Sequence, residues 1–373
     1  MRSLAALKML LHDRSTTAGS VLGVVAIVFL VGQQLSVLFG LFNYMSVLVD
    51  HSGADIWVCT QNIQNINGAG FMPVRYVDRI SGLPDVEWVE PLVFGSASFR
   101  TREGQYQPVQ VVGLRNPRQA CGPWRFYQGA QDALFDYEGI TLDRLDLNVL
   151  GSPQMNHFYE IGDIRTKVLG ITQSIRGFAG TLVFTNMVKA KEILKTPAGR
   201  CKAILIKVKP DTDISAMIGV LQKMFPRNEV LTTADLSRRT RAYYIKNTGI
   251  GGSFGFSTLI GALVGIIIIM LTMYTSVLNR TKEFAVLRAL GARKIDILIV
   301  VASQSLIIAA IGIFIGFLFL ALFLAGTLDS VLPSYMPTWI LFYHAGFTLI
   351  MAMLGSILAM RRAIKIEPAT VFR

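Results

Sequence analysis

The side chains that could carry chemistry are few, and they are scattered along the chain. Four carboxylates in its middle part are close enough in sequence to supply a general acid–base pair: Asp143, Asp146, Glu160 and Asp163. A solvated polar surface explains the same residues more simply, and we prefer that interpretation. His344 lies near the start of an apolar segment and is a candidate functional residue, although a histidine at the membrane interface is the more common case.

Neither the histidines nor the cysteines form a metal-binding pattern. The four histidines are His12, His51, His157 and His344, and the three cysteines are Cys59, Cys121 and Cys201. None of the cysteines has a CxxC or other zinc-ligand spacing. One disulfide among them and three buried free thiols both remain open. The chain also lacks a P-loop and the motifs of zinc proteases, serine hydrolases and kinases, so we expect a non-catalytic protein with no cofactor of its own.

Composition points to a membrane protein. Of the 373 residues, 52% are hydrophobic and only 16% are charged, whereas soluble proteins carry about a quarter charged residues. The net charge of +12 is typical of Lys and Arg that hold cytoplasmic loops in place. No basic stretch is interleaved with aromatic residues, so nucleic-acid binding is not expected.

Four long apolar runs predict four transmembrane helices, at 16–50 (a span with a stalk), 247–279, 295–325 and 341–360. The first run is too long for the apolar core of a signal peptide. Residues 1–15 have an amphipathic pattern, which predicts a helix on the membrane surface, with a disordered basic N-terminus as the alternative. Gln33 and Gln34 interrupt the first run and either line a substrate path or hydrogen-bond between helices. Close packing of the second helix in a dimer is predicted at Gly251, Gly255, Gly261 and Gly265.

Residues 51–246 are polar and rich in β-branched residues, and they are numerous enough for a domain with its own core. Strand, helix and turn patterns predict an α+β fold with two βαββ-like halves, at about 51–115 and 200–234. A β-rich insert at about 116–199 separates them. In the first half we expect strands at 86–93 and 96–100, and a hairpin turn at Glu103-Gly104.

The placement of Lys and Arg predicts the topology. The N-terminus, the segment 280–294 and the tail 361–373 are basic, whereas the loop 326–340 has neither Lys nor Arg. The three basic segments should be cytoplasmic, and the loop and the large domain should lie outside.

The segment 280–294 has the pattern of a short helix that continues the second span out of the membrane. Phe284, Leu287 and Leu290 fall on overlapping faces, with charged residues around them. Gly291 suits the position just beyond a helix end. An apolar knob set in charge is a surface that a soluble subunit could bind.

Residues 280–292, RTKEFAVLRALGA, closely resemble the signature of the FtsX/MacB/LolCE-type ABC transporter permeases, also called type VII or mechanotransmission permeases. The four-span order, the strand-like ADIWV at 54–58 and the closing Pro368-Ala369-Thr370 fit the same family. The chain is most similar to DevC-like permeases, which lack a fused ATPase.

The resemblance implies that residues 280–292 couple the chain to an ATPase. The coupling residues would be Arg280, Thr281, Lys282, Glu283, Phe284, Leu287, Arg288, Leu290, Gly291 and Ala292. It also implies a homodimer in the bacterial inner membrane with a periplasmic domain, bound to a separate ATPase that holds ATP and Mg²⁺. The expected function is export in a tripartite system with a periplasmic adaptor and an outer-membrane channel. Two alternatives remain: a signalling or scaffold subunit that regulates periplasmic enzymes, and extraction of lipids or lipoproteins from the inner membrane.

Overall fold

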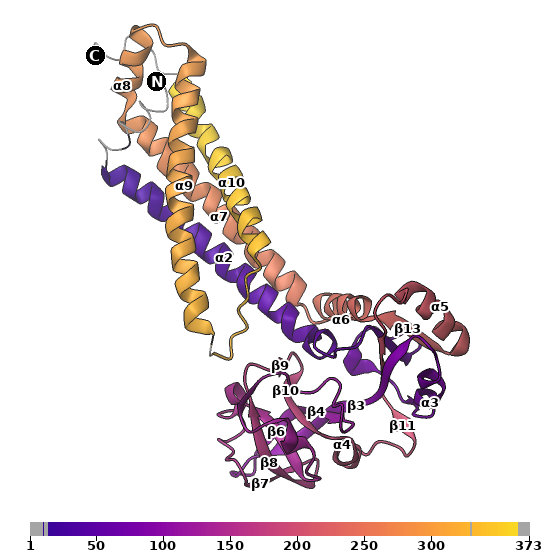
Figure 1. Cartoon of the computed structure of the whole chain (residues 1–373). Helices are drawn as coiled ribbons and strands as arrows, with labels where there is room; N and C mark the ends of the chain where they lie inside the picture. Colours follow the sequence, from indigo (N-terminus) through magenta and orange to yellow (C-terminus); the bar gives the residue numbers. More distant parts are fainter. Residues whose placement is uncertain (1–9, 11–13, 329, 365–373) are drawn as a thin grey trace. The chain divides into compact units, whose positions relative to one another are not determined.

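The computed structural model describes residue 10 and residues 14–328 and 330–364. These residues form two compact units. One contains residues 14–40, 251–328 and 332–364 and is helical, and the other contains residues 41–250 and 330–331 and holds the strands (Figure 1). The amphipathic helix predicted at 1–15 falls almost entirely outside the described residues, as does Pro368-Ala369-Thr370.

Within the part of the chain that the structure describes, four helices are long and apolar enough to cross a membrane. They are α2 (Arg14–Asp50), α7 (Ile250–Asn279), α9 (Lys294–Thr327) and α10 (Thr338–Ile364). Each of the four predicted spans is therefore a helix. A shorter helix of this unit, α8 (Thr281–Ala289), lies between α7 and α9.

The helices pack through small residues and branched apolar side chains. On α9, Gly312 and Gly316 sit against α2: a Cβ at these positions would lie 2.5 Å from Val24 Cγ1 and 2.6 Å from Val28 Cγ1. The two glycines form a GxxxG pair that allows the helix backbones to approach closely. This pair is visible in the sequence IGIFIG, but our sequence-based prediction missed it.

The sheet unit contains a βαββαβ arrangement, with the insert between its second and third strands. Its four strands are β1 (Ile56–Thr60), β3 (Val86–Arg100), β12 (Ala203–Val208) and β13 (Asn228–Thr232), and its helices are α3 (Tyr76–Ser81) and α5 (Ile214–Met224). The strand order is β13-β1-β12-β3, with all neighbours antiparallel. The strands of the two predicted halves thus join in a single sheet.

Strand β3 links this sheet to the insert. Its first part, to Leu92, pairs with β12, and its second part, from Val93, pairs with β4 (Tyr106–Leu114). The two strands predicted at 86–93 and 96–100 are therefore one strand, because Gly95 continues the extended backbone and leaves room for the side chain of Leu194. The predicted hairpin turn at Glu103-Gly104 lies between β3 and β4, with φ +82° at Gly104.

The insert closes into a small barrel. Its strands are β6 (Gly139–Asp143), β7 (Phe158–Ile161), β8 (Ile164–Thr172) and β10 (Gly180–Asn186), together with β3 and β4. β7 pairs with both β8 and β3, so the strands close in the order β3-β4-β10-β6-β8-β7. Closure removes free sheet edges. The barrel core includes Phe99, Val111, Ile140, Leu142 and Val183, all completely buried.

The remaining elements connect these parts. They are β2 (Met72–Pro73), β5 (Phe126–Gln128), β9 (Arg176–Gly177), β11 (Arg200–Cys201), α4 (Met187–Ile193), α6 (Thr233–Asn247) and the 3₁₀ turns Ile66–Gly68, Gln131–Leu134 and Arg144–Asp146.

Helices α3 and α5 cover one face of the βαββαβ sheet through Ile80 and Leu221. The other face packs on Val49 at the end of α2 and on Leu236 of α6.

Candidate functional sites

Helix α8 is a separate helix, so our prediction that it continues α7 is wrong. Arg280 interrupts the two helices with φ −109° and ψ 19°, and its side chain is buried. The hydroxyl of Thr281 donates to the carbonyl of Leu278 (2.7 Å), which keeps the bend compact. The helical direction therefore changes at Arg280.

The apolar face of α8 is divided between the inside and the outside of its unit. Phe284 is completely buried and packs in the common core of α2, α7, α9 and α10, and Leu287 packs against the same core. Leu290 is 80% exposed and Val286 is 42% exposed. The exposed residues of α8 and its C-cap are therefore Lys282, Glu283, Val286, Ala289 and Leu290, and Phe284 is not part of the knob that we expected.

The end of α8 agrees with the sequence. Gly291 has φ +92°, its N–H donates to the carbonyl of Arg288 (3.0 Å), and the N–H of Ala292 donates to the carbonyl of Leu287 (3.0 Å). These two bonds form a Schellman motif, in which a left-handed glycine ends the helix. Arg288 also donates to the carbonyl of Ile364 at the end of α10 (3.2 Å). The turn between α8 and α9 is thus stabilised by its own backbone hydrogen bonds and by the hydrogen bond from Arg288 to α10.

The four glycines predicted for dimer packing have different surroundings. Gly265 is buried within its own unit, where a Cβ would lie 2.7 Å from Met351 Cε and 3.1 Å from Ile27. Gly261 faces Val31 of α2, at 3.6 Å. Gly255 has open space around it, and Gly251 is half-buried. Gly265 therefore serves packing within the chain, because α2 and α10 already cover it.

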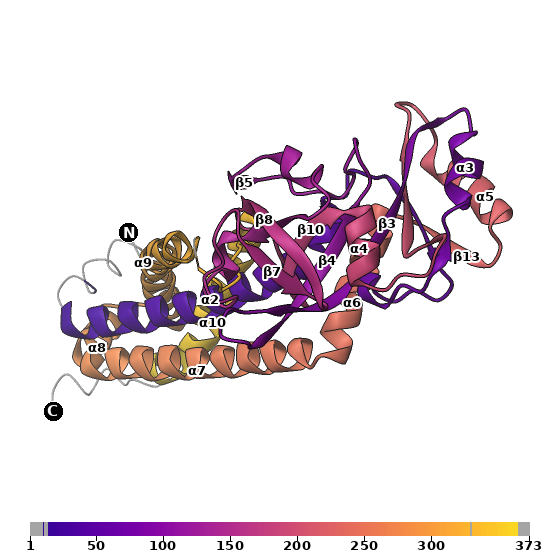
Figure 2. The same cartoon turned by 90° about the horizontal axis from the view of Figure 1, so that it is seen from below.

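An apolar groove lies between α2 and α7, which run side by side in both views (Figures 1 and 2). Its volume is about 380 Å³. Its walls are mainly aliphatic, and its polar groups are gathered at Gln33, Gln34, Ser257 and Thr258. Gln33 and Gln34 thus line this groove, and the choice between a substrate path and hydrogen bonding between helices stays a prediction.

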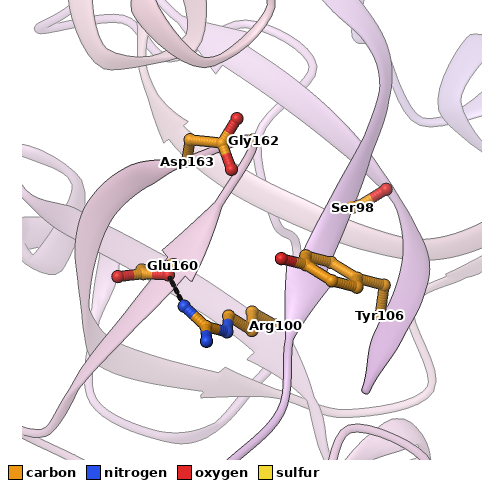
Figure 3. Close-up of a pocket in the computed structure, with 6 residues that line it drawn as sticks. All are labelled: Ser98, Arg100, Tyr106, Glu160, Gly162 and Asp163. Carbon is orange, nitrogen blue, oxygen red and sulfur yellow. Dashed lines mark hydrogen bonds and ion pairs between the residues drawn. The ribbon is translucent and has the colours of Figure 1, made fainter. Parts of the chain in front are cut away.

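Two of the four candidate carboxylates lie in a polar surface pocket of about 260 Å³ on the barrel. Figure 3 shows Arg100 of β3 paired with Glu160 of β7, with Tyr106 and Asp163 at other sides of the pocket. The two charged atoms are 2.9 Å apart, and both side chains are about half exposed. The hydrogen bond from Arg100 and the open surroundings indicate a solvated ion pair, as our preferred interpretation predicts.

The other two carboxylates, Asp143 and Asp146, are completely buried in a different place, so our preferred interpretation of a solvated surface is wrong for them. Asp143 accepts hydrogen bonds from the hydroxyl of Thr172 (2.9 Å) and the N–H of Ile175 (2.7 Å). Asp146 lies 3.0 Å from Nε of Arg176. Burial raises the pKa of both carboxyl groups, against the lowering effect of Arg176 on Asp146. The four residues therefore do not meet in one site, and the buried pair has no access for a substrate.

The three cysteines are free and buried. Burial raises the pKa of Cys201 to about 12, and it raises the pKa values of the Cys59 and Cys121 thiols as well. They are weak nucleophiles in the folded chain, because the thiolate is the reactive form. Among the described residues, no group of three His, Cys, Asp or Glu side chains could hold a metal ion.

Comparison with known proteins finds a match for part of the helical unit. Residues 255–368 match the family model of the FtsX-like permease C-terminal domain. No protein of curated function matches the chain. The periplasmic region of MacB from Actinobacillus actinomycetemcomitans is 10% identical with a TM-score of 0.36, and the similarity covers 50% of this chain and 93% of that one.

A second solved structure has a similar relationship to the chain. The extracellular domain of the noncanonic ABC-type transporter YknZ from Gram-positive bacteria is 10% identical with a TM-score of 0.37, over 48% of this chain and 99% of that one. Similarities as low as these carry no conclusion about function. The family model covers residues 255–368, which include α8 and the last two membrane helices, and this part of the chain matches the C-terminal domain of the FtsX-like permeases.

Proposed function

We propose that the chain is the membrane subunit of an ABC transporter whose ATPase is a separate protein. The observation that supports this most strongly is the match of residues 255–368 to the FtsX-like permease domain. In this proposal, two copies of the chain bind two ATPase subunits, which hold ATP and Mg²⁺. Closure of the ATPases moves α8, and the movement passes along the membrane helices to the sheet domain.

The orientation of the chain is part of the proposal. Basic residues gather around α8 and its turn, at Arg280, Lys282, Arg288, Arg293 and Lys294. The loop between α9 and α10 has neither Lys nor Arg. The positive-inside rule then places α8 in the cytoplasm and the sheet domain in the periplasm. Exposed Leu290 and Val286, with Lys282 and Glu283 beside them, are the contact that we assign to the ATPase.

Export through a tripartite system is the form of this function that we favour. The sheet domain has its own core and is large enough to bind a periplasmic adaptor, which would lead to an outer-membrane channel. The substrate would then be taken from the periplasm without crossing the permease.

The proposal is tested by purifying the full-length chain from native membranes under mild conditions. We expect an ATPase subunit to co-purify, and its ATP hydrolysis to change when the chain is reconstituted in lipid nanodiscs. Mass spectrometry of the same sample identifies the adaptor, if export is the function. Failure of any ATPase to bind would overturn the proposal.

The groove between α2 and α7 favours a second candidate, extraction of lipids or lipoproteins. An acyl chain fits its aliphatic walls, while Gln33 and Gln34 can hydrogen-bond to a headgroup or ester. Gly261→Phe would fill the groove, whereas Gly252→Phe changes a helix surface with open space around it. Quantitative lipid mass spectrometry should show less bound lipid only for Gly261→Phe. Equal lipid in both variants and in the parent protein would exclude a lipid site in this groove.

A further inference from the structure

We propose that the hairpin formed by β9 and β10 connects the sheet domain to membrane-helix movement, and that Arg176 fastens the α9–α10 connection to this hairpin. The inference rests on the proposed function, since it concerns how movement reaches the domain. Arg176 is a positioning residue here.

Arg176 joins a buried carboxylate to a backbone carbonyl of the α9–α10 connection. Its Nε lies 3.0 Å from Oδ1 of Asp146, whose side chain is completely buried. A second guanidinium N–H donates to the carbonyl oxygen of Val331 (3.2 Å). Residues 330–331 belong to the sheet domain, although they lie between two membrane helices. Arg176 is therefore a direct link between the barrel and that connection.

The base of the hairpin is attached to the barrel by hydrogen bonds. The N–H of Ile175, one residue before β9, donates to Asp143, which also accepts from Thr172. Gly177 is buried and closely packed, because a Cβ would lie 2.8 Å from Oε1 of Gln110 and 3.2 Å from the carbonyl oxygen of Gly180. These contacts stabilise the position of Arg176, and a rigid base is needed if the hairpin is to transmit a displacement.

The same hairpin contacts the other two segments that continue into membrane helices. The N–H of Phe178 donates to the carbonyl of Tyr44 in α2 (3.0 Å). The ring of Phe178 packs on Tyr244 of α6, with the ring centres 4.5 Å apart, and α7 follows α6 directly. Residues 176–178 therefore contact all three segments that connect the two units, which are the end of α2, helix α6 and the α9–α10 connection at Val331.

The α9–α10 connection is also held along α2. The N–H of Tyr335 donates to the carbonyl of Ser36 (2.9 Å). A Cβ at Gly40 would lie 2.5 Å from the carbonyl group of Pro333, so glycine is required for the backbone to pass there. A displacement of α2 or α9 therefore moves Val331. The hydrogen bond between Arg176 and Val331 transmits this displacement to the barrel.

Arginine is needed because its planar group has several N–H donors in a fixed fork, and one lysine ammonium cannot span the same two acceptors. Arg176→Lys should keep the charge opposite Asp146 and release Val331. The matched control is Arg165→Lys, because Cζ of Arg165 lies 3.7 Å from the centre of the exposed ring of Phe158.

The first experiment measures the mobility of a nitroxide attached through Val331→Cys in the full-length protein. The three native cysteines are buried, so the introduced thiol is labelled selectively. We expect Arg176→Lys to make the nitroxide more mobile while the thermal unfolding temperature stays close to that of the parent. Arg165→Lys should leave the spectrum unchanged. Unchanged mobility in Arg176→Lys would overturn the fastening role.

The second experiment places the nitroxide through Ala179→Cys, at the exposed turn of the hairpin, in the complex with the co-purified ATPase. Binding of ATP should change the parent spectrum, and Arg176→Lys should lose most of that change while Arg165→Lys keeps it. A full ATP response in Arg176→Lys would overturn the transmitting role. If the parent itself showed no response, the proposed coupling function would be contradicted, whatever the first experiment shows.

Discussion

Leu290 is 80% exposed, whereas Phe284, six residues earlier and joined to it by α8, is completely buried. The two residues therefore have different roles in the segment that we assign to the ATPase contact. Phe284 attaches α8 to the core of the helical unit, together with Ala285, and Leu290 is free to enter a partner. A buried attachment with an exposed end is the arrangement that the proposed ATPase contact requires.

We expect Leu290→Asp to abolish the effect of the chain on ATP hydrolysis by its partner without changing thermal unfolding. The exposed side chain loses no packing, but a carboxylate would be buried unpaired on binding. Leu328→Asp is the control, since Leu328 is 72% exposed at the other end of α9. Phe284→Ala should instead destabilise the chain by about 3–5 kcal/mol, as for other buried aromatic residues. If Leu290→Asp and Leu328→Asp lost the effect on ATP hydrolysis equally, this contact would be contradicted.

Gly291→Ala should destabilise the turn between α8 and α9 by about 1 kcal/mol, because residues with a Cβ are strained in the left-handed region. The φ of +92° and the two Schellman hydrogen bonds carry this prediction. The measurement is the thermal unfolding temperature in detergent. Gly346→Ala in α10 is the comparison, as a Cβ there meets nothing within 4 Å and alanine favours a helix. The prediction would be wrong if both variants unfolded at the parent temperature.

Local signals in the sequence predicted the helices and the turn at Gly291. Long apolar runs set the lengths of α2, α7, α9 and α10, and a glycine after a helical pattern marks a helix end. The burial of Phe284 could not be predicted in this way. Periodicity shows that Phe284, Leu287 and Leu290 share a face, but not whether that face meets the chain's own helices or a partner.

Contacts between distant residues explain the other differences. Closure of the barrel depends on the pairing of Phe99 with Ile161, which are far apart in the chain. The link from Arg176 to Asp146 and Val331 is equally distant, and neither partner has a local signal. Gly265 matched a dimer motif, yet the same motif serves packing within one chain, and only the position of Met351 distinguishes the two uses.

The two GxxxG pairs of α7 should respond differently to large side chains. Gly265→Leu should prevent correct packing of α7 on α2 and α10, because a Cβ there already lies 2.7 Å from Met351. Gly255→Leu meets open space within the chain, so it should leave folding intact and weaken association of two copies if α7 contributes to the dimer. Cross-linking in membranes measures association, and thermal unfolding measures packing. A stable dimer of Gly255→Leu would exclude this part of α7 from the dimer interface.

The stability of the sheet domain should depend on pH through Asp143. Burial raises the pKa of its carboxyl group above the ordinary value of 3.8, although hydrogen bonds from Ile175 and Leu145 lower it in part. The folded chain therefore holds this proton more tightly than the unfolded chain does. The resulting contribution to the free energy of unfolding is complete below 3.8 and falls as the pH rises to the folded-state pKa.

Asp143→Asn removes this titration, so the stability of the parent relative to Asp143→Asn should fall as the pH rises from about 4 to about 7. Thermal unfolding of both full-length proteins across this range measures the difference. Asp163→Asn is the control, since Asp163 is exposed in the surface pocket and its replacement should not produce the same trend. A difference between parent and Asp143→Asn that stayed constant with pH would show that burial does not perturb Asp143, because a group with equal pKa values in both states adds no pH dependence.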